Sequence, residues 1–286
     1  MLIRNEYLEA SFKAKGAELC SLKALDTGLE YIWQADAAHW GRHAPVLFPI
    51  VGALKDGQFQ FAGKQYPLSR HGFARNAEFV VDEQGADHIT FLLASSEATL
   101  EVYPFPFELR ITYTLAGKKL TVGYDVCNTA DAEMYFSIGG HPAFNCPMAG
   151  DGSKFDYRFI YSEEEQADAH WLVNDLFSGE TTRVLEGQEL PIGPDTFAKD
   201  ALVFKGLKSG SVTLASSQRE WLRFHFAGFP YLGLWSASAE APFVCIEPWY
   251  GIADNFNHNG DWTQKEGIQK LEGGTSFSCA YGIEVL

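Results

Sequence analysis

The sequence predicts an all-β fold, an antiparallel sandwich or barrel, on three observations. Apolar and polar residues alternate with period two in many short runs, turn residues separate these runs, and helical patterns are few. Such patterning is typical of antiparallel sandwiches and barrels. The 286 residues, 46% of them hydrophobic, suffice for a sizeable core, and no repeat, low-complexity tract or Pro/Ser linker interrupts them. We therefore predict a single domain over residues 1–286.

Each predicted element follows from a local pattern. Strand-like runs cover residues 8–13, 78–82, 89–94 and 243–247. Three hairpins are indicated, over residues 59–68, 109–126 and 212–226, with turns near residues 62–64, 116–118 and 216–218. The middle hairpin has the clearest alternation, with apolar residues at Leu109, Ile111, Tyr113, Leu115, Leu120, Val122, Tyr124 and Val126. Short helices are expected over residues 36–40 and 166–173, and the acidic run 163–165 is expected on a solvated face.

The charge and cysteine content limit which partners the protein can bind and which cellular compartment it occupies. The 22 Lys and Arg against 37 Asp and Glu give a net charge of −15, which disfavours binding to nucleic acid and to anionic membranes. No apolar run has the length of a membrane span, and the first residues lack the apolar core of a signal peptide. Five scattered cysteines without a Cys-x-x-Cys pair favour reduced thiols and a cytoplasmic protein. Nothing marks an interface, so a monomer or weak dimer is expected.

Two histidines in glycine-rich turns are the leading candidates for chemistry. His141 lies in Gly139-Gly140-His141-Pro142, where glycine and proline exclude a regular helix and favour a tight bend. His71 lies in Arg70-His71-Gly72, close to Arg75, whose charge is expected to lower the histidine pKa. Histidine both donates and accepts protons near neutral pH, which suits general acid–base chemistry. A structural histidine, hydrogen-bonded in a loop or at a strand end, is the alternative for each.

A carboxylate far downstream is the candidate partner of these histidines. Glu247 follows the apolar stretch 243–246, and burial at a strand end is expected to raise its pKa towards the range of a general base. The neighbouring Trp249 and Tyr250 offer flat surfaces for a sugar ring. The alternative is a strand-end glutamate that pairs with an arginine.

Residues 39–77 reverse the sign of the chain's charge. The segment has one acid, Asp56, against the five cations Arg42, Lys55, Lys64, Arg70 and Arg75. It is either an anion pocket for phosphate or carboxylate or a set of scattered surface charges. No metal centre is predicted, because Cys-x-x-Cys pairs are absent and the nearby histidines have no carboxylate close in sequence. The signatures of serine hydrolases, nucleotide kinases and dinucleotide enzymes are also absent.

Across its whole length the chain resembles the aldose 1-epimerase (galactose mutarotase-like) family. The order and spacing of six motifs carry the resemblance, at residues 16–19, 45–49, 71–75, 140–145, 199–202 and 247–249. They place the chain near the bacterial branch associated with lactose operons, close to the glucose-6-phosphate 1-epimerases. The resemblance implies a large antiparallel β-supersandwich and an isomerase that interconverts the α and β anomers of aldoses without a cofactor.

The resemblance also implies roles for the three candidate catalytic residues. By it, His141 is the general acid that protonates the ring oxygen, and Glu247 is the general base that takes the proton from the anomeric hydroxyl. His71 is similar to a histidine that hydrogen-bonds the sugar near the ring oxygen. A histidine with a pKa near 7 and a glutamate with a pKa raised by burial would let each group work in both directions as the ring opens and recloses.

The substrate-binding candidates are Arg42, Arg75, Asp200, Trp249 and Phe73, and the resemblance implies this role for the first three. In the sugar-phosphate branch, arginines at positions similar to Arg42 and Arg75 bind the phosphate. The galactose-type enzymes carry an Asn-His-Ser-like motif where this chain has residues 140–142, so the chain falls outside that branch. A hexose-6-phosphate-specific mutarotase, a non-catalytic carbohydrate-binding or sensing protein, and a glycoside hydrolase with two carboxylates therefore remain as alternatives.

Overall fold

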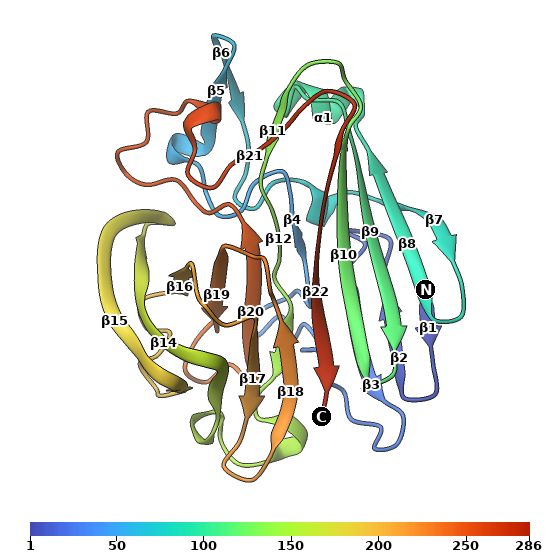
Figure 1. The fold of residues 1–286 in the computed structure, drawn as a ribbon, viewed down its shortest axis with the longest axis vertical. Coiled ribbons are helices and arrows are strands. Elements are labelled where there is room, and N and C mark those ends of the chain that lie inside the picture. Colours follow the sequence, from blue (N-terminus) through green and yellow to red (C-terminus); the bar gives the residue numbers. More distant parts are fainter.

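The computed structural model of the protein describes residues 1–286 and confirms the all-β antiparallel prediction (Figure 1). One 15-stranded sheet runs in the order β4-β12-β20-β19-β16-β14-β17-β18-β22-β10-β9-β8-β7, with β13 paired to β20 and β15 to β14. A three-stranded sheet β1-β2-β3 and two pairs, β11-β21 and β5-β6, complete the fold.

The strands are mostly short, apart from two long hairpins and the C-terminal strand. Their bounds are β1 Leu2–Arg4, β2 Leu8–Phe12, β3 Leu19–Ala24, β4 Val46–Leu47, β5 Gln58–Phe61, β6 Lys64–Pro67, β7 Val80–Gln84, β8 His88–Ala94, β9 Phe107–Ala116, β10 Lys119–Asn128, β11 Met134–Phe136, β12 Ile138–Gly140, β13 Ala143–Asn145, β14 Arg158–Val173, β15 Leu176–Pro191, β16 Leu202–Lys205, β17 Ser211–Ala215, β18 Glu220–His225, β19 Tyr231–Trp235, β20 Phe243–Tyr250, β21 Gln269–Leu271 and β22 Ser276–Val285. The α-helix is α1 Glu97–Val102, and the 3₁₀ turns are Lys55–Gly57, Ala74–Asn76, Met148–Gly150, Lys154–Asp156 and Trp262–Gln264.

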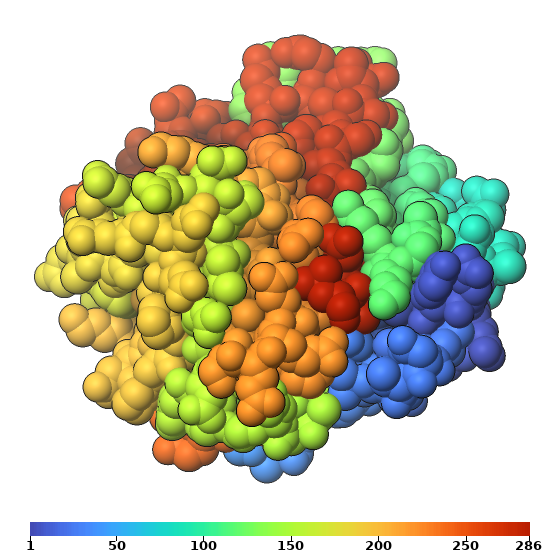
Figure 2. Space-filling model, turned by 60° about the horizontal axis from the view of Figure 1, so that its bottom comes forward, coloured from blue at the N-terminus to red at the C-terminus, as the bar shows by residue number.

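The small N-terminal sheet covers one face of the large sheet. The Phe12 ring lies 4.5 Å from the ring of Tyr113 on β9 and 6.0 Å from that of Phe91 on β8. The Tyr113 hydroxyl donates to the carbonyl of Ala17, 2.8 Å away. One cluster of 66 buried residues joins these layers into a continuous core, and alternation on β9 and β10 points every second side chain into it. In Figure 2 the blue N-terminal segments lie against the green strands and the red C-terminal end.

The predicted hairpins form, because alternation and turn chemistry are local properties of the chain. β9 and β10 pair with Leu115 opposite Leu120, and β5–β6 and β17–β18 form the other two predicted hairpins. The predicted runs at residues 8–13, 89–94 and 243–247 lie on β2, β8 and β20. The run at residues 78–82 begins two residues late, as β7.

Both predicted helices are wrong. Residues 166–173 lie in β14, where Ala169 and Trp171 are buried with period two. Ala169 pairs with Thr182 on β15, so sheet pairing overrides local helix propensity. Residues 36–40 make one turn, in which the Trp40 N–H donates to the Asp36 carbonyl at 2.9 Å. The helix that does form, α1, was not predicted. It has a capping box in which Ser96 and Thr99 exchange hydrogen bonds.

The acidic run is only partly solvated. Glu163 and Glu164 are exposed, but Glu165 is 4% exposed and accepts from the backbone N–H of Ser209 at 2.7 Å. The pairing of β14 with β15 is irregular between Ile160 and Glu165, which breaks the alternation and leaves Glu165 buried while Glu163 is exposed. This overturns the prediction of a uniformly solvated run. All five cysteines are free thiols. No helix in the structure is long and apolar enough to span a bilayer.

Candidate active site

Strand β20 supplies one wall of a cavity of about 300 Å³. It lies between β19 on one side and β12 and β13 on the other, and is buried along most of its length. Val244 and Ile246 point into the main core, whereas Glu247 and Trp249 line the cavity, as alternation in a strand requires. The polar lining is His71, His141, Glu247, Asp200, Arg70, Arg75 and Asp175, and the aromatic lining is Trp40, Trp235, Trp249 and Phe177.

His141 is held against Glu247 by a bend directly after β12. The backbone N–H of His141 donates to the Pro45 carbonyl at 3.1 Å. Its imidazole stacks on Trp40, with ring centroids 4.9 Å apart and planes 24° apart. Its Nε2 lies 3.2 Å from Oε2 of Glu247, and both residues are at least nine-tenths buried. The structure thus brings together the predicted acid and base from positions 106 residues apart.

Burial sets the charge of this pair. It lowers the pKa of His141 to about 3 and raises the pKa of Glu247 well above its usual range, in the second case helped by Asp200 and opposed by Arg70. The expected rise for Glu247 is confirmed. The expected pKa near 7 for His141 is wrong, because the sequence does not reveal that this side chain is 8% exposed and experiences the charges of Arg70, Arg75 and Arg42. The pair therefore favours the uncharged form, with one proton shared between Nε2 and Oε2.

His71 lies beside His141 in an edge-to-face arrangement, with ring centroids 5.8 Å apart. The Gly52 N–H donates to its Nδ1 at 3.1 Å, and the Arg70 Nε lies 3.1 Å from its Nε2. A neutral imidazole accepts one such bond and a protonated one accepts neither. Burial lowers the pKa of His71 well below its usual value, with added contributions from His141 and from nearby arginines that include Arg75. The predicted lowering is confirmed, with desolvation as its main cause.

Arg70 was overlooked among the predicted site residues, although it is adjacent to His71 in the motif. Its guanidinium contacts Oδ1 of Asp175 at 2.6 Å, and both side chains line the cavity. Asp175 lies between β14 and β15, so this ion pair fastens the tip of that hairpin over the cavity. No sequence pattern could have identified Asp175, because its partner is 105 residues away.

The other predicted substrate-binding residues divide into two groups. Arg75, Asp200 and Trp249 line the cavity. Phe73 instead packs against the core, with its ring 6.2 Å from that of Phe48. Arg42 is not among the lining residues, and its Nη2 donates to Oδ1 of Asn76 at 3.0 Å. Substrate contact by Phe73 and Arg42 stays a prediction that this geometry does not favour.

Trp249 is wedged between two glycines. A Cβ at Gly139 would lie 2.5 Å from Cδ1 of the indole, and a Cβ at Gly233 on β19 would lie 2.6 Å from its Cη2. We expect Gly233→Ala to displace the indole into the cavity, lowering the free energy of unfolding by about 1–3 kcal/mol and weakening ligand binding. Thermal denaturation and ligand titration measure the two effects. Gly41→Ala is the control, because its Cβ would have no atom within 4 Å. An unchanged melting temperature and an unchanged ligand affinity in Gly233→Ala would contradict this close packing of the indole.

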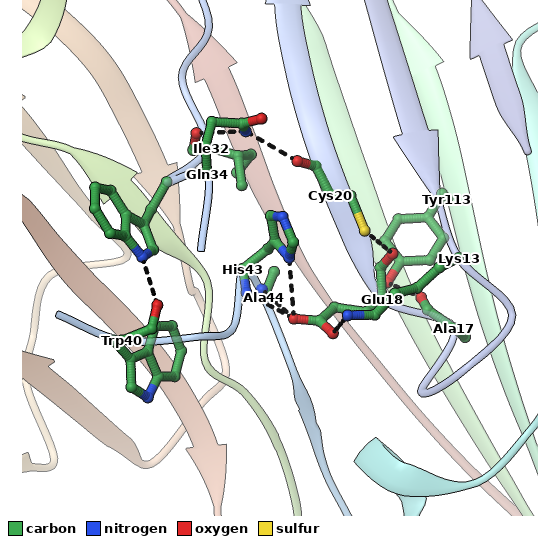
Figure 3. Close-up of polar contacts among 11 residues, drawn as sticks. Lys13, Ala17, Glu18, Cys20, Ile32, Gln34, Trp40, His43, Ala44 and Tyr113 are labelled. Carbon is green, nitrogen blue, oxygen red and sulfur yellow. Dashed lines mark hydrogen bonds and ion pairs between the residues drawn. The ribbon is translucent and has the colours of Figure 1, made fainter. Parts of the chain in front are cut away.

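A buried carboxylate supports the loop that carries His141. Glu18 is 1% exposed and accepts from the backbone N–H groups of His43 at 2.7 Å and Ala44 at 3.1 Å (Figure 3). Lys13 forms an ion pair with the same carboxylate. Burial by itself raises the pKa of Glu18, but the interactions with the His43 side chain, whose Nδ1 lies 3.7 Å from Oε1, with Lys13 and with the His43 backbone N–H outweigh it and lower the pKa to about 2.

The residues that Glu18 holds are bonded in turn to the segment of His141. The His43 carbonyl accepts from the Ala143 N–H at 2.9 Å, and the Pro45 carbonyl accepts from the His141 N–H. Glu18 therefore acts on the His141 segment through residues 43–45, whose N–H groups bind Glu18 and whose carbonyls accept from the His141 segment. This makes Glu18 a positioning residue, which no local pattern around residues 16–19 indicated.

Comparison with known proteins gives the same family from sequence and from structure. A model of the family described as Aldose 1-epimerase matches residues 1–268. Protein LacX of Lactococcus lactis subsp. lactis is 36% identical over 296 residues, covering 99% of this chain and 98% of that protein. A galactose mutarotase related enzyme from Lactobacillus acidophilus superposes with a TM-score of 0.96 at 35% identity, over 100% of this chain and 97% of the other. A galactose mutarotase-like protein from Lactobacillus casei superposes with a TM-score of 0.94 at 32% identity, over 100% of this chain and 99% of the other.

Proposed function

Because this chain belongs to the aldose 1-epimerase family, we propose that it interconverts the α and β anomers of a hexose or hexose phosphate by acid–base ring opening. The observation that carries the proposal is the contact of 3.2 Å between His141 and Glu247 at the wall of a cavity of about 300 Å³. Two groups that share one proton, next to a space of monosaccharide scale, suit a reaction that moves one proton onto the sugar and one off it.

The proposed reaction balances within the pair. Ring opening starts from the form of the pair in which the shared proton is on Nε2 of His141 and Glu247 is ionised. His141 delivers that proton to the ring oxygen while Glu247 takes the proton from the anomeric hydroxyl, so the C1–O5 bond breaks and a C1 carbonyl forms. The pair is then uncharged, which is the form that burial favours. After rotation about the C1–C2 bond, Glu247 returns its proton to the carbonyl oxygen and His141 takes the proton of the O5 hydroxyl as the ring closes. His71, kept neutral by burial, hydrogen-bonds the sugar without supplying a proton.

The pH profile follows from the need for one proton in the pair. We expect kcat/KM to fall as the pH approaches about 3, where His141 and Glu247 are both protonated, and to fall again as the pH rises through the raised pKa of Glu247. Between these limits kcat/KM should be flat. Anomerisation rates across this range measure the profile, and an acid limb near pH 6.5 would contradict the lowered pKa of His141.

A hexose phosphate is favoured as substrate by Arg75, a guanidinium at the cavity that experiences the charges of Arg42 and Arg70. Arg75 donates to the Arg70 carbonyl at 2.7 Å, makes no ion pair, and has a buried Nε without a hydrogen-bond partner. Burial and the charges of Arg42 and Arg70 lower the pKa of Arg75 to about 10. A dianionic phosphate would satisfy this guanidinium and relieve the repulsion.

Replacing Arg75 tests the phosphate. We expect Arg75→Ala to weaken binding of glucose 6-phosphate by about 1.5–3 kcal/mol, the scale of a charge-assisted hydrogen bond, with little change for glucose. Calorimetric titration of both sugars measures the difference. Arg183→Ala is the matched control, because that arginine is exposed on β15 and pairs with Asp168. Equal affinity for glucose 6-phosphate in wild type and Arg75→Ala would rule out the phosphate role.

Anomer exchange measured by saturation-transfer NMR tests the epimerase itself. Glucose, galactose and glucose 6-phosphate are compared with the enzyme and with buffer alone. Exchange faster than in buffer supports the proposal, and the fastest sugar identifies the substrate class. Binding without accelerated exchange of any of the three would favour a carbohydrate-binding or sensing protein instead. Release of reducing sugar from an aryl glycoside would favour a hydrolase.

A further inference from the structure

Cys245 is a buried thiol that the proposed reaction does not use. It lies two residues before Glu247 on β20, so alternation places both side chains on the same side of the sheet. Its side chain packs with Trp33, Ala143 and Phe243, and it is completely buried. One donor atom each from His141, Cys245 and Glu247 all lie within 4.8 Å of one another.

These distances are close to what a tetrahedral cation needs. Zinc bonds of about 2.0–2.2 Å to nitrogen and oxygen place neighbouring ligand atoms about 3.4 Å apart. The separation of 3.2 Å between His141 Nε2 and Glu247 Oε2 already matches this edge. The thiol lies within 4.8 Å of both atoms, so it must close by no more than about 1 Å to complete a triangle, given a zinc–sulfur bond of about 2.3 Å. Nδ1 of His141 is buried without a hydrogen-bond partner, so no bond to that atom restrains the ring.

We propose that His141, Cys245 and Glu247 form a binding site for a thiophilic divalent cation such as Zn²⁺ or Cd²⁺. Thiolate and imidazole ligands select these ions over Mg²⁺ and Ca²⁺, which prefer oxygen. His141 and Glu247 line the cavity, so the cation enters from there and keeps its fourth position open to water on that side. The thiol and the carboxyl release their protons to solvent, and the two resulting anions balance the charge of the cation.

A bound cation and a sugar exclude each other at this site. The cation would occupy Nε2 of His141 and the carboxylate of Glu247, the atoms that the proposed reaction uses to move protons. Zn²⁺ is therefore expected to inhibit anomerisation, and saturating sugar is expected to weaken cation binding. The inhibition rests on the proposed function, but the binding of the cation does not.

Titration with Cd²⁺ alone tests the site without any need for activity, because a cadmium–thiolate bond adds ultraviolet absorption. We expect the band to saturate at one equivalent in wild type and to be absent in Cys245→Ser. Glu247→Gln should bind Cd²⁺ more than about 100-fold more weakly, since loss of an outer partner alone costs about 10–100-fold. Cys127→Ser is the control, because that partly buried thiol lies on β10 and not at the cavity.

The outcomes separate the two proposals. A saturating band that persists in Cys245→Ser, or that disappears in Cys127→Ser, would overturn the cation site. If Cys245→Ser fails to fold by thermal denaturation, Cys245→Ala replaces it in the same titration. A band that requires Cys245, together with no anomer exchange for any sugar, would leave the cation site standing and reject the epimerase. Exchange in wild type that Zn²⁺ does not slow, despite saturation of the site, would overturn the exclusion between cation and sugar.

Discussion

Glu247→Gln is expected to lower kcat for anomerisation by about 10²–10⁴, the usual contribution of one general acid–base group. Glutamine keeps the size and a hydrogen bond to His141 but can neither accept nor return a proton. Since the substitution removes proton transfer and not the cavity, KM should change much less than kcat. Saturation-transfer NMR with varied sugar concentration measures both quantities. A variant with wild-type kcat would reject Glu247 as the base.

The same substitution should not destabilise the protein at neutral or alkaline pH. Burial raises the folded-state pKa of Glu247, so its stabilising contribution is complete below the unfolded pKa of 4.5 and is lost as the pH rises through the folded pKa. Glutamine removes this loss, and the melting temperature of Glu247→Gln at pH 8 is expected to equal or exceed that of wild type. The control for activity is Glu189→Gln, an exposed glutamate that pairs with Arg158. A lower melting temperature would mean that lost activity reflects unfolding.

Glu18→Gln is expected to have the largest effect on stability. The folded-state pKa of about 2, against 4.5 unfolded, corresponds to about 3 kcal/mol of unfolding free energy above pH 4.5. This contribution is lost in wild type as the pH falls from 4.5 to 2. In the glutamine variant it is absent at every pH, so the two proteins should converge in stability in acid. Urea denaturation at pH 7 and pH 3 measures the difference.

The activity of Glu18→Gln should also fall, because Glu18 positions the loop that holds His141. We expect Glu18→Gln to lower kcat about tenfold with little change in KM, since misplacement of the imidazole affects proton transfer more than binding. Glu9→Gln is the matched control, because its ion pair with Arg4 is long, at 3.8 Å, and more exposed, and should contribute less than about 1 kcal/mol. Equal losses in both variants would contradict the positioning role.

The sequence was sufficient for most of the fold because the evidence for it is local. Alternation on β9 and β10 with a tight turn between them specifies a hairpin and its register, whatever surrounds it. Where local sequence signals were weak, tertiary packing determined the secondary structure. Residues 166–173 have helical propensity, but the burial of Ala169 and Trp171 against β15 makes them a strand.

The candidate site was predictable where a motif constrains the backbone. Glycine and proline around His141 and glycine beside His71 are readable in the sequence, and both side chains reach the cavity. Glu247 reaches it too, but from inside β20 and not from the strand end that the sequence predicted, because the strand continues to Tyr250. Phe73 belongs to the same motif as His71, yet its ring turns into the core. A motif shows that a backbone is held in place but does not show which way each of its side chains points.

The sequence by itself determined the β-rich architecture, the hairpins and the identity of the proposed acid and base. Only the tertiary structure decided that Arg70 meets Asp175, that Glu18 supports the loop of His141, and that Cys245 lies beside the pair. It also decided that the pKa of His141 is far below 7. The physical reason is the same for each: contacts between distant segments and the removal of water depend on how the sheets pack, which no local pattern encodes.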